Sequence, residues 1–484
     1  MESRVVDHVP KLVGVALVVT FIYSGLSNPL SKLPGPWYSK WTDLAAKYHY
    51  YKGNKVFYVH NLHKKFGPYV RIGPNEVSVA DLDATKIIYS TKETFRKTIF
   101  YRHLTAQSIA NIFTTADVDY HRKLRRLMSA QLSESSLKSL LPAITSRVEL
   151  AIQRMKEDME TRGFADVFKW SLFMTTDVIG ELAFGESFQM LEKGEKNQYI
   201  HDLEGVGALS AVRVTFPRVL ALARKYPLPI FQKNLQQARR ILGYAEQSLQ
   251  RYQYYIDQNP EAPKQIFVTK MFKAREDEKL SFSEIVINAQ SFIVAGSDTT
   301  SNSLTYLLWS VCRRPELRDA LVRELQTLPN DFTEHDLREL PFLSQCIEET
   351  LRLYSAVPAP LPREVPQGGV ELGGYWLPGG TTVATQAYTM HRHPEIFPNP
   401  DEFDPYRWAS PTKAMKEAFM PFGRGPRRLH LAYIELRLAT ARFFQEFPTA
   451  HISAREGMSD DDMIETIYFL MSPKGKRCLI EKAS

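Results

Sequence analysis

One long stretch, residues 281–314, constrains the fold of this chain more than any other part of the sequence. It begins with a capping box, in which the Ser281 side chain can accept from the amide three residues on and Glu284 can reach back. Apolar residues then run almost unbroken to Pro315. A helix of about 33 residues, at ~1.5 Å per residue, is roughly 50 Å long. The sequence therefore predicts a rod that crosses a whole domain.

The middle of this stretch, residues 295–300, is small, polar and acidic. Small side chains such as Ala295 let a flat ligand approach the backbone. Burying Asp298 beside Thr299 costs free energy, which suggests that the pair has a task. The alternative interpretation is a kink at Gly296 with Asp298 pointing at solvent.

Composition places the chain among ordinary globular proteins, with 44% apolar and 24% charged residues in a length of 484. The net charge of +7 is mild and favours a weakly basic face towards a membrane or an acidic protein. It does not suggest a nucleic-acid partner. The cysteines, Cys312, Cys346 and Cys478, show neither metal spacing nor a disulfide framework, which favours a reducing compartment.

The N-terminus carries an apolar run at residues 12–26, which is short for a membrane span of about 20 residues. A signal-peptide core is the alternative, but no clean cleavage site precedes the Pro-rich segment that follows. We expect a membrane anchor over residues 1–30, a Pro-rich hinge over 31–36 and a single catalytic domain over 37–484.

The rest of the chain is mostly helical in pattern, with a minor sheet. Residues 69–79 read as a hairpin around a Gly-Pro-Asn turn, and residues 357–390 contain further β-type runs between Pro and Gly. A final helix is predicted over roughly 429–447. The predicted fold class is mainly α with a minor β part.

Charged residues form a second signal downstream of the long helix. Glu349 and Arg352 lie three residues apart on one predicted helix face and can pair, which alone is usually an ordinary helix salt bridge. Arg407, in an aromatic-Pro-x-Arg-Trp type of segment, can join them as a third charge. A glycine-rich turn, residues 421–428, then leads directly into the final helix.

These motifs, taken in order over nearly the whole length, resemble a membrane-anchored, microsomal-type cytochrome P450, a haem-thiolate monooxygenase. The residue sequences of several segments are most similar to those of fungal secondary-metabolism members. The resemblance implies the cytochrome P450 fold, with the long central helix over a haem site. It also implies electrons from NADPH through a cytochrome P450 reductase, a hydrophobic small-molecule substrate, and an endoplasmic-reticulum membrane location with a cytosolic catalytic domain.

The resemblance carries roles to individual residues of this chain. Asp298 and Thr299 match the pair that delivers protons to iron-bound dioxygen, and Glu349, Arg352 and Arg407 match a buried ion-pair network with a structural role. The cofactor-binding residues that it implies are His121, where the family often has Trp, and Arg125, Arg363, Phe422, Gly425 and Arg427. The substrate-pocket residues that it implies are Phe113, Ala295, Val357 and Leu361.

The haem-binding turn departs from the family pattern at the residue that matters most. In the family the turn continues Arg-x-Cys-x-Gly, and the cysteine thiolate is the axial ligand of the iron. Here Leu429 follows Arg428 directly, so the triplet with that cysteine and glycine is missing and no metal ligand is assigned. No other cysteine can substitute by position. His430 could bind iron, although a histidine on a helix surface is the ordinary explanation.

Three interpretations remain open on the sequence. The first is a working monooxygenase whose sequence here omits a triplet at a splice boundary. The second is a catalytically silent relative that binds a hydrophobic ligand or a partner at the membrane. The third is a haem protein with altered ligation. We favour the first, because the acid–threonine pair and the arginines of the site are retained.

Overall fold

The computed structural model describes residues 2–90, 94–107, 109–129, 134–196, 198–219, 222, 226, 229–259, 266–277, 280–329, 331–424 and 430–482. The helices are α1 Glu2–Ser27, α2 Leu44–Tyr51, α3 Lys55–Phe66, α4 Leu82–Ile88, α5 Phe100–Leu104, α6 Val118–Ser129, α7 Glu134–Arg162, α8 Val167–Phe184, α9 Met190–Lys193, α10 Gln198–Thr215, α12 Pro229–Gln258, α13 Thr269–Asp277, α14 Phe282–Cys312, α15 Pro315–Leu325, α16 Glu334–Arg338, α17 Pro341–Leu353, α18 Ala387–Met390, α19 Lys413–Ala418 and α20 His430–Glu446. The strands are β1 Tyr69–Gly73, β2 Glu76–Val79, β3 Arg96–Lys97, β4 Ala165–Asp166, β5 Arg363–Glu364, β6 Val370–Leu372, β7 Tyr375–Leu377, β8 Thr382–Ala384, β9 Ala450–Ile452, β10 Glu465–Ile467, β11 Met471–Pro473 and β12 Leu479–Lys482.

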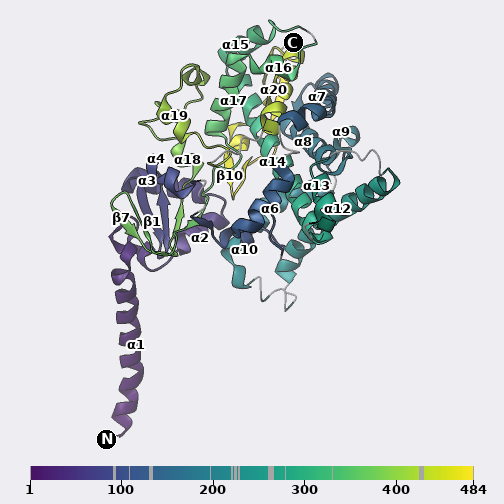
Figure 1. The fold of residues 1–484 in the computed structure, drawn as a ribbon. Helices are drawn as coiled ribbons and strands as arrows, with labels where there is room; N and C mark the ends of the chain where they lie inside the picture. The colour runs from purple at the N-terminus through teal and green to yellow at the C-terminus, as the bar shows by residue number, and fades with distance from the viewer. Residues whose placement is uncertain are drawn as a thin grey trace.

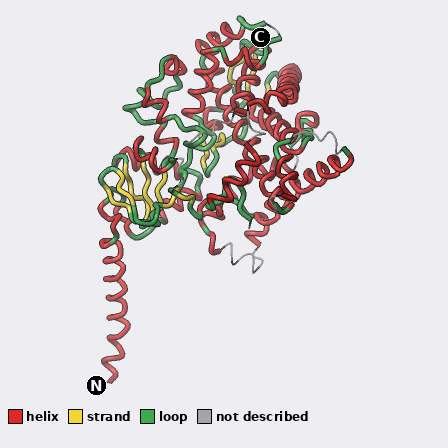
Figure 2. The backbone as a smooth tube through the Cα atoms, viewed as in Figure 1, coloured by secondary structure: helices red, strands yellow, loops and turns green. Residues whose placement is uncertain are grey.

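Helices make up most of the molecule, and the largest sheet lies at one side of the helical body near α1 and α3 (Figures 1 and 2). That sheet has the order β1-β2-β8-β5-β3. The predicted hairpin is confirmed, because β1 and β2 pair antiparallel from Tyr69↔Val79 onwards. β2 then pairs in parallel with β8, which brings the N-terminal and the Pro- and Gly-punctuated regions together. The mainly α fold class with a minor β part is confirmed.

Helix α14 lies inside the helical body (Figure 1) and packs against α8, α12, α17 and α20. Its predicted capping box is present: the Glu284 amide donates to Ser281 Oγ at 3.2 Å, and the Ser281 amide donates to Glu284 Oε2 at 2.8 Å. At the other end, Arg314 donates to the carbonyl of Ser310 at 2.8 Å, which satisfies a group in the last turn. The predicted rod is therefore a single unbroken helix.

Helix α1 extends away from the body and leaves it beside the sheet (Figure 1). Its second half carries exposed apolar side chains such as Leu17, and Trp41 donates to the carbonyl of Phe21 at 2.8 Å. Among the described residues, however, no helix combines the length and the apolar character that crossing a membrane requires. The expectation of a single-pass anchor in residues 1–30 is not supported by this finding.

Candidate functional site

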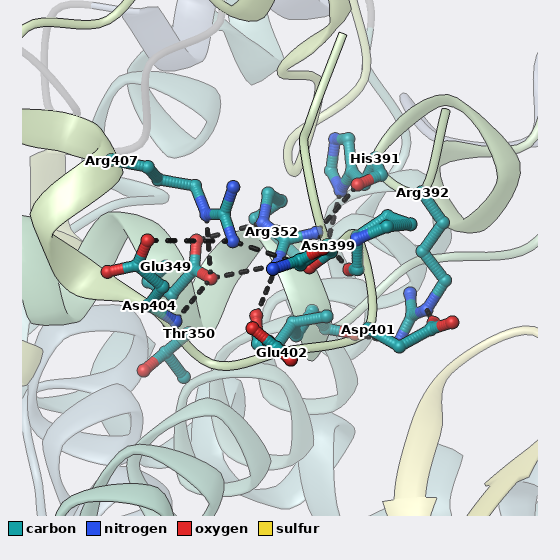
Figure 3. Close-up of polar contacts among 12 residues, drawn as sticks. Glu349, Thr350, Arg352, His391, Arg392, Asn399, Asp401, Glu402, Asp404 and Arg407 are labelled. Atoms are coloured by element: carbon teal, nitrogen blue, oxygen red, sulfur yellow. Dashed lines mark hydrogen bonds and ion pairs between the residues drawn. The ribbon is translucent and has the colours of Figure 1, made fainter. Parts of the chain in front are cut away.

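A buried ion-pair network joins α17 to the segment that follows α18 (Figure 3). Arg352 donates to both carboxylate oxygens of Glu349 at 2.8 Å, and both side chains are fully buried. Arg407 donates to Glu349 Oε1 at 3.1 Å. The structure thus brings together the three charges that the sequence singled out.

Neighbouring groups complete the network around this carboxylate. The Trp408 indole donates to Glu349 Oε2 at 2.9 Å, and the Asp404 amide donates to Oε1 at 2.9 Å. Arg352 also donates to the carbonyls of His391 at 2.8 Å and Glu402 at 2.9 Å. A buried charge is tolerated when its hydrogen-bonding capacity is met in this way. The network fixes a long loop onto α17.

Gly296 in α14 has a packing role that the sequence did not reveal. A β-carbon at this position would lie 2.6 Å from Ile179 Cγ1 of α8, so only glycine allows the two helices to approach this closely. The Thr175 hydroxyl of α8 donates to the Ser297 carbonyl at 2.9 Å in the same contact. The helix continues through Gly296, so the alternative of a kink there is wrong.

The face of α14 that carries Ala295 is accessible, although the helix lies inside the body. Ala295 is exposed, whereas Ile293 and Ser297 on either side are buried. Thr299 is partly buried, and its hydroxyl donates to the Ala295 carbonyl at 2.5 Å. Accessible surface next to a small residue is what a bound flat molecule would need at this position.

Asp298 is set apart by its electrostatics. Loss of hydration on burial is the main cause that raises the pKa of its carboxyl to about 7, and nearby Glu204 raises it further, whereas Lys476 lowers it. A carboxyl with a pKa near neutrality can hold and release a proton at physiological pH. Asp298 and Thr299 are adjacent in the sequence but have different neighbours. The Asp298 carboxyl is near Glu204 and Lys476, whereas the Thr299 hydroxyl contacts the Ala295 carbonyl.

Phe113 and Val357, two of the expected pocket residues, lie next to residues that bond to α14 or to the β10–β11 hairpin. The Ile112 amide, beside Phe113, donates to Asn288 Oδ1 of α14 at 2.9 Å. The Phe113 ring, 38% exposed, lies 5.7 Å from the ring of Phe469 at the tip of the β10–β11 hairpin. The Met471 amide of the same hairpin donates to the Ala356 carbonyl at 3.0 Å, next to Val357. Leu361 instead approaches the glycine-rich turn, where a β-carbon at Gly423 would lie 3.5 Å from its Cδ1.

The expected cofactor-binding residues have unequal environments. On α6, His121 is buried and Arg125 is exposed. Arg363 donates to the Phe95 carbonyl at 3.2 Å, and its Nε is buried without a hydrogen-bond partner among the described residues. The Phe422 ring lies 5.7 Å from that of Tyr433. Gly425, Arg427 and Leu429 lie outside the described residues.

The thiols of Cys312, Cys346 and Cys478 are all buried in the packing of the main core. Burial raises the pKa of each thiol, which opposes thiolate formation. The described residues also contain no group of three or more His, Cys, Asp or Glu side chains that could hold a metal ion. Their burial makes these thiols poor candidates for the iron ligand that the glycine-rich turn lacks.

Sequence reasoning missed three residues near this region. Phe469 lies between β10 and β11, and its only sequence signal was an aromatic residue in an apolar stretch near the C-terminus. Glu435 of α20 is 2% exposed, and burial raises the pKa of its carboxyl to about 8, opposed by a hydrogen bond from Thr300. Its only signal was an acid within an apolar helix. His391 had none, because its partners are far away in the sequence.

Comparison with known proteins agrees with this architecture. The cytochrome P450 family profile matches residues 33–478. The chain is 47% identical to cytochrome P450 monooxygenase tazI of Aspergillus terreus over 96% of both chains. It is 42% identical to cytochrome P450 monooxygenase orf2 of Aspergillus niger over 99% of this chain and 100% of the relative. It is also 39% identical to cytochrome P450 monooxygenase azaI of Aspergillus niger over 86% of this chain and 94% of the relative. The chain therefore belongs to the cytochrome P450 family.

Proposed function

We propose that this protein is a monooxygenase that inserts one oxygen atom from O2 into a hydrophobic small molecule in secondary-metabolite biosynthesis. The observation that carries the proposal is the match to named monooxygenases over nearly the whole chain. The proposal includes a cysteine encoded by a triplet between Arg428 and Leu429, which the printed sequence lacks.

The residues of this chain fit the edge of a haem but not its iron. Arg363 has a buried Nε with no hydrogen-bond partner among the described residues, and a propionate carboxylate would satisfy it. His121 and Arg125 would hold the other carboxylate from α6. No cysteine occurs at the glycine-rich turn, so the printed polypeptide cannot form a thiolate-ligated haem.

The chain's own residues support roles in binding and proton handling. The accessible face at Ala295, with Phe113, Val357 and Leu361, would receive an apolar substrate. Asp298 would hold a proton on its carboxyl at neutral pH, because its pKa is raised to about 7. Thr299, whose hydroxyl donates to the Ala295 carbonyl, would present that hydroxyl at the Ala295 face.

A catalytically silent relative that binds a hydrophobic ligand is the second candidate, and the absent cysteine favours it. Sequencing the transcript across the codons for Arg428 and Leu429 separates the two. A Cys-containing triplet supports the monooxygenase, and its absence supports the silent relative.

Spectroscopy tests the physical side of the same choice. The printed chain and a variant with the triplet Cys-Leu-Gly inserted after Arg428 are loaded with haem, reduced and exposed to CO. We expect the band typical of thiolate ligation from the insertion variant only. That band from the printed chain, or its absence from both proteins, contradicts the proposed site.

An electron-donating reductase and NADPH follow from the family, and exposed cations on α6 support this partner. Arg122 and Arg126 are exposed, Arg122 pairs with Asp119 at 3.0 Å, and such a patch would attract an acidic protein. We expect Arg122→Glu to weaken binding of a flavoprotein reductase at low salt and to have little effect at high salt. Arg455→Glu, an exposed cation on another element, is the control.

Membrane attachment is proposed through α1 and the aromatic residues beside it. The Phe21 and Trp41 rings stack at 5.9 Å, and Trp37, 75% exposed, lies 6.2 Å from Trp41. Exposed aromatic rings of this kind favour the membrane–water interface. We expect Trp37→Ala to lower co-sedimentation with phosphatidylcholine vesicles, whereas Tyr406→Ala, also exposed, should not. Equal co-sedimentation of both variants and the wild type contradicts the proposal.

A further inference from the structure

His391 lies directly after α18 and is completely buried, and both of its ring nitrogens have a partner. Nδ1 lies 2.8 Å from the Arg352 carbonyl, and Nε2 lies 2.8 Å from the Met420 amide nitrogen. Figure 3 shows the ring beside Arg352, at the edge of the ion-pair network. The imidazole therefore bridges two segments that are not adjacent in the sequence.

The partners determine which nitrogen carries the proton. A backbone amide can only donate, so Nε2 accepts from Met420, and Nδ1–H donates to the Arg352 carbonyl. A neutral imidazole satisfies both contacts at once. Burial, together with Arg352 and Arg392, holds the pKa of His391 at about 3, so the ring stays neutral at physiological pH.

On one side, His391 and Arg352 hold each other reciprocally. The Arg352 side chain donates to the His391 carbonyl at 2.8 Å, while the His391 ring donates to the Arg352 carbonyl. Arg352 is itself fixed by two hydrogen bonds to Glu349. The ring is thus held directly by a residue of the ion-pair network.

On the other side, Met420 directly precedes the glycine-rich turn. The Gly423 amide donates to the Met420 carbonyl at 3.0 Å, and Gly423 has a φ of 77°, which favours glycine. The Phe419 ring stacks on the imidazole at 5.6 Å. The imidazole therefore anchors the residue from which the turn starts.

We infer that His391 is a positioning residue that couples the Glu349–Arg352 ion-pair network to the turn at residues 420–424. This inference rests on the proposed function only where it assigns that turn to the edge of a porphyrin. Through His391, the network sets the place of Phe422 and Gly423, not only the stability of the core.

Two variants separate the two hydrogen bonds. Asn at position 391 puts its amide near the place of Nδ1, so His391→Asn keeps the contact to Arg352 and loses that to Met420. Gln reaches further, so His391→Gln can place its Oε1 near Nε2 and keep the contact to Met420. His393→Asn, two residues along, is the control, because His393 Nδ1 has no hydrogen-bond partner among the described residues.

The first readout is residue-resolved hydrogen exchange of the Met420 amide in the full chain. We expect exchange to be about tenfold faster in His391→Asn, for a lost hydrogen bond, and close to wild type in His391→Gln and His393→Asn. Equal exchange in all four proteins overturns the inference. Should His391→Asn not fold, fast exchange in His391→Gln would overturn it.

The second readout is the affinity for iron-free protoporphyrin IX, followed by quenching of its fluorescence, which needs no axial ligand. We expect about tenfold weaker binding for His391→Asn and rescue by His391→Gln. Affinity losses that follow only the melting temperature, without rescue, overturn the positioning role. Failure of the wild type to bind the porphyrin would instead refute the proposed haem edge, while the exchange result would still test the coupling.

Discussion

Two buried glutamates on neighbouring helices, Glu349 of α17 and Glu435 of α20, have very different hydrogen-bond donors. Glu349 receives N–H donors from Arg352, Arg407, Trp408 and the Asp404 backbone. Glu435 has no cation beside it among the described residues and accepts from the Thr300 hydroxyl. Burial alone therefore does not decide what a carboxyl does, because its donors decide whether it serves as an ion or as an acid.

The same contrast separates two parts of the candidate site. Around Glu349, the buried carboxylate is paired with Arg352 and Arg407, and the structural result is a fixed loop. Two carboxyls with raised pKa values lie along α14. Asp298, on the helix itself, has a pKa of about 7, and Glu435, which contacts Thr300 of the helix, has a pKa of about 8. The first region resists change, while the second can exchange protons near neutral pH.

The largest effect should come from breaking the paired region. Arg352→Leu leaves Glu349 buried with fewer donors, so the free energy of unfolding should fall by about 3–5 kcal/mol in urea denaturation. Asp83→Asn is the control, since it removes only an exposed pair with Lys86 and should leave the urea midpoint almost unchanged. Similar losses in the two variants would remove the distinction between paired and surface charges.

The pH dependence of the free energy of unfolding tests the second region, through Glu435. Unfolded Glu435 loses its proton near pH 4.5, whereas the folded residue keeps it to about pH 8. Between these values the folded state binds the extra proton, so the free energy of unfolding falls as pH rises, by up to about 1.4 kcal/mol per pH unit. Glu435→Gln should flatten this slope in denaturation series from pH 5 to 8. An unchanged slope would mean that Glu435 is ionised in the folded protein.

A smaller change tests the donor itself. The Thr300 hydroxyl bond lowers the pKa of Glu435, so Thr300→Val should raise that pKa further and cost about 1 kcal/mol at pH 7. The measurement is the midpoint of the pH dependence of unfolding, relative to wild type. Thr305→Val is the control, because that hydroxyl donates only to the Ser301 carbonyl of its own helix. A downward shift of the midpoint would contradict the assignment of the donor.

How much of this could be read from the sequence depended on the distance between partners. The capping box of Ser281 and Glu284 and the pair of Glu349 and Arg352 are local, and both were predicted. His391 meets Met420 through a contact that leaves no periodic trace in the sequence. The packing role of Gly296 was not predicted for the same reason, because its constraint comes from Ile179 on another helix.

The least disruptive test addresses Asp298, whose carboxyl is mostly protonated at pH 6 because burial raises its pKa to about 7. Asn is a neutral replacement of nearly the same shape, so Asp298→Asn should change the free energy of unfolding at pH 6 by less than ~1 kcal/mol. Infrared difference spectra from pH 6 to 9 should lose the protonated-carboxyl component that titrates near pH 7, while Glu435→Gln should lose the one near pH 8. If neither substitution removes a component, the carboxyls along α14 are not protonated near neutral pH, and the contrast between the two regions fails.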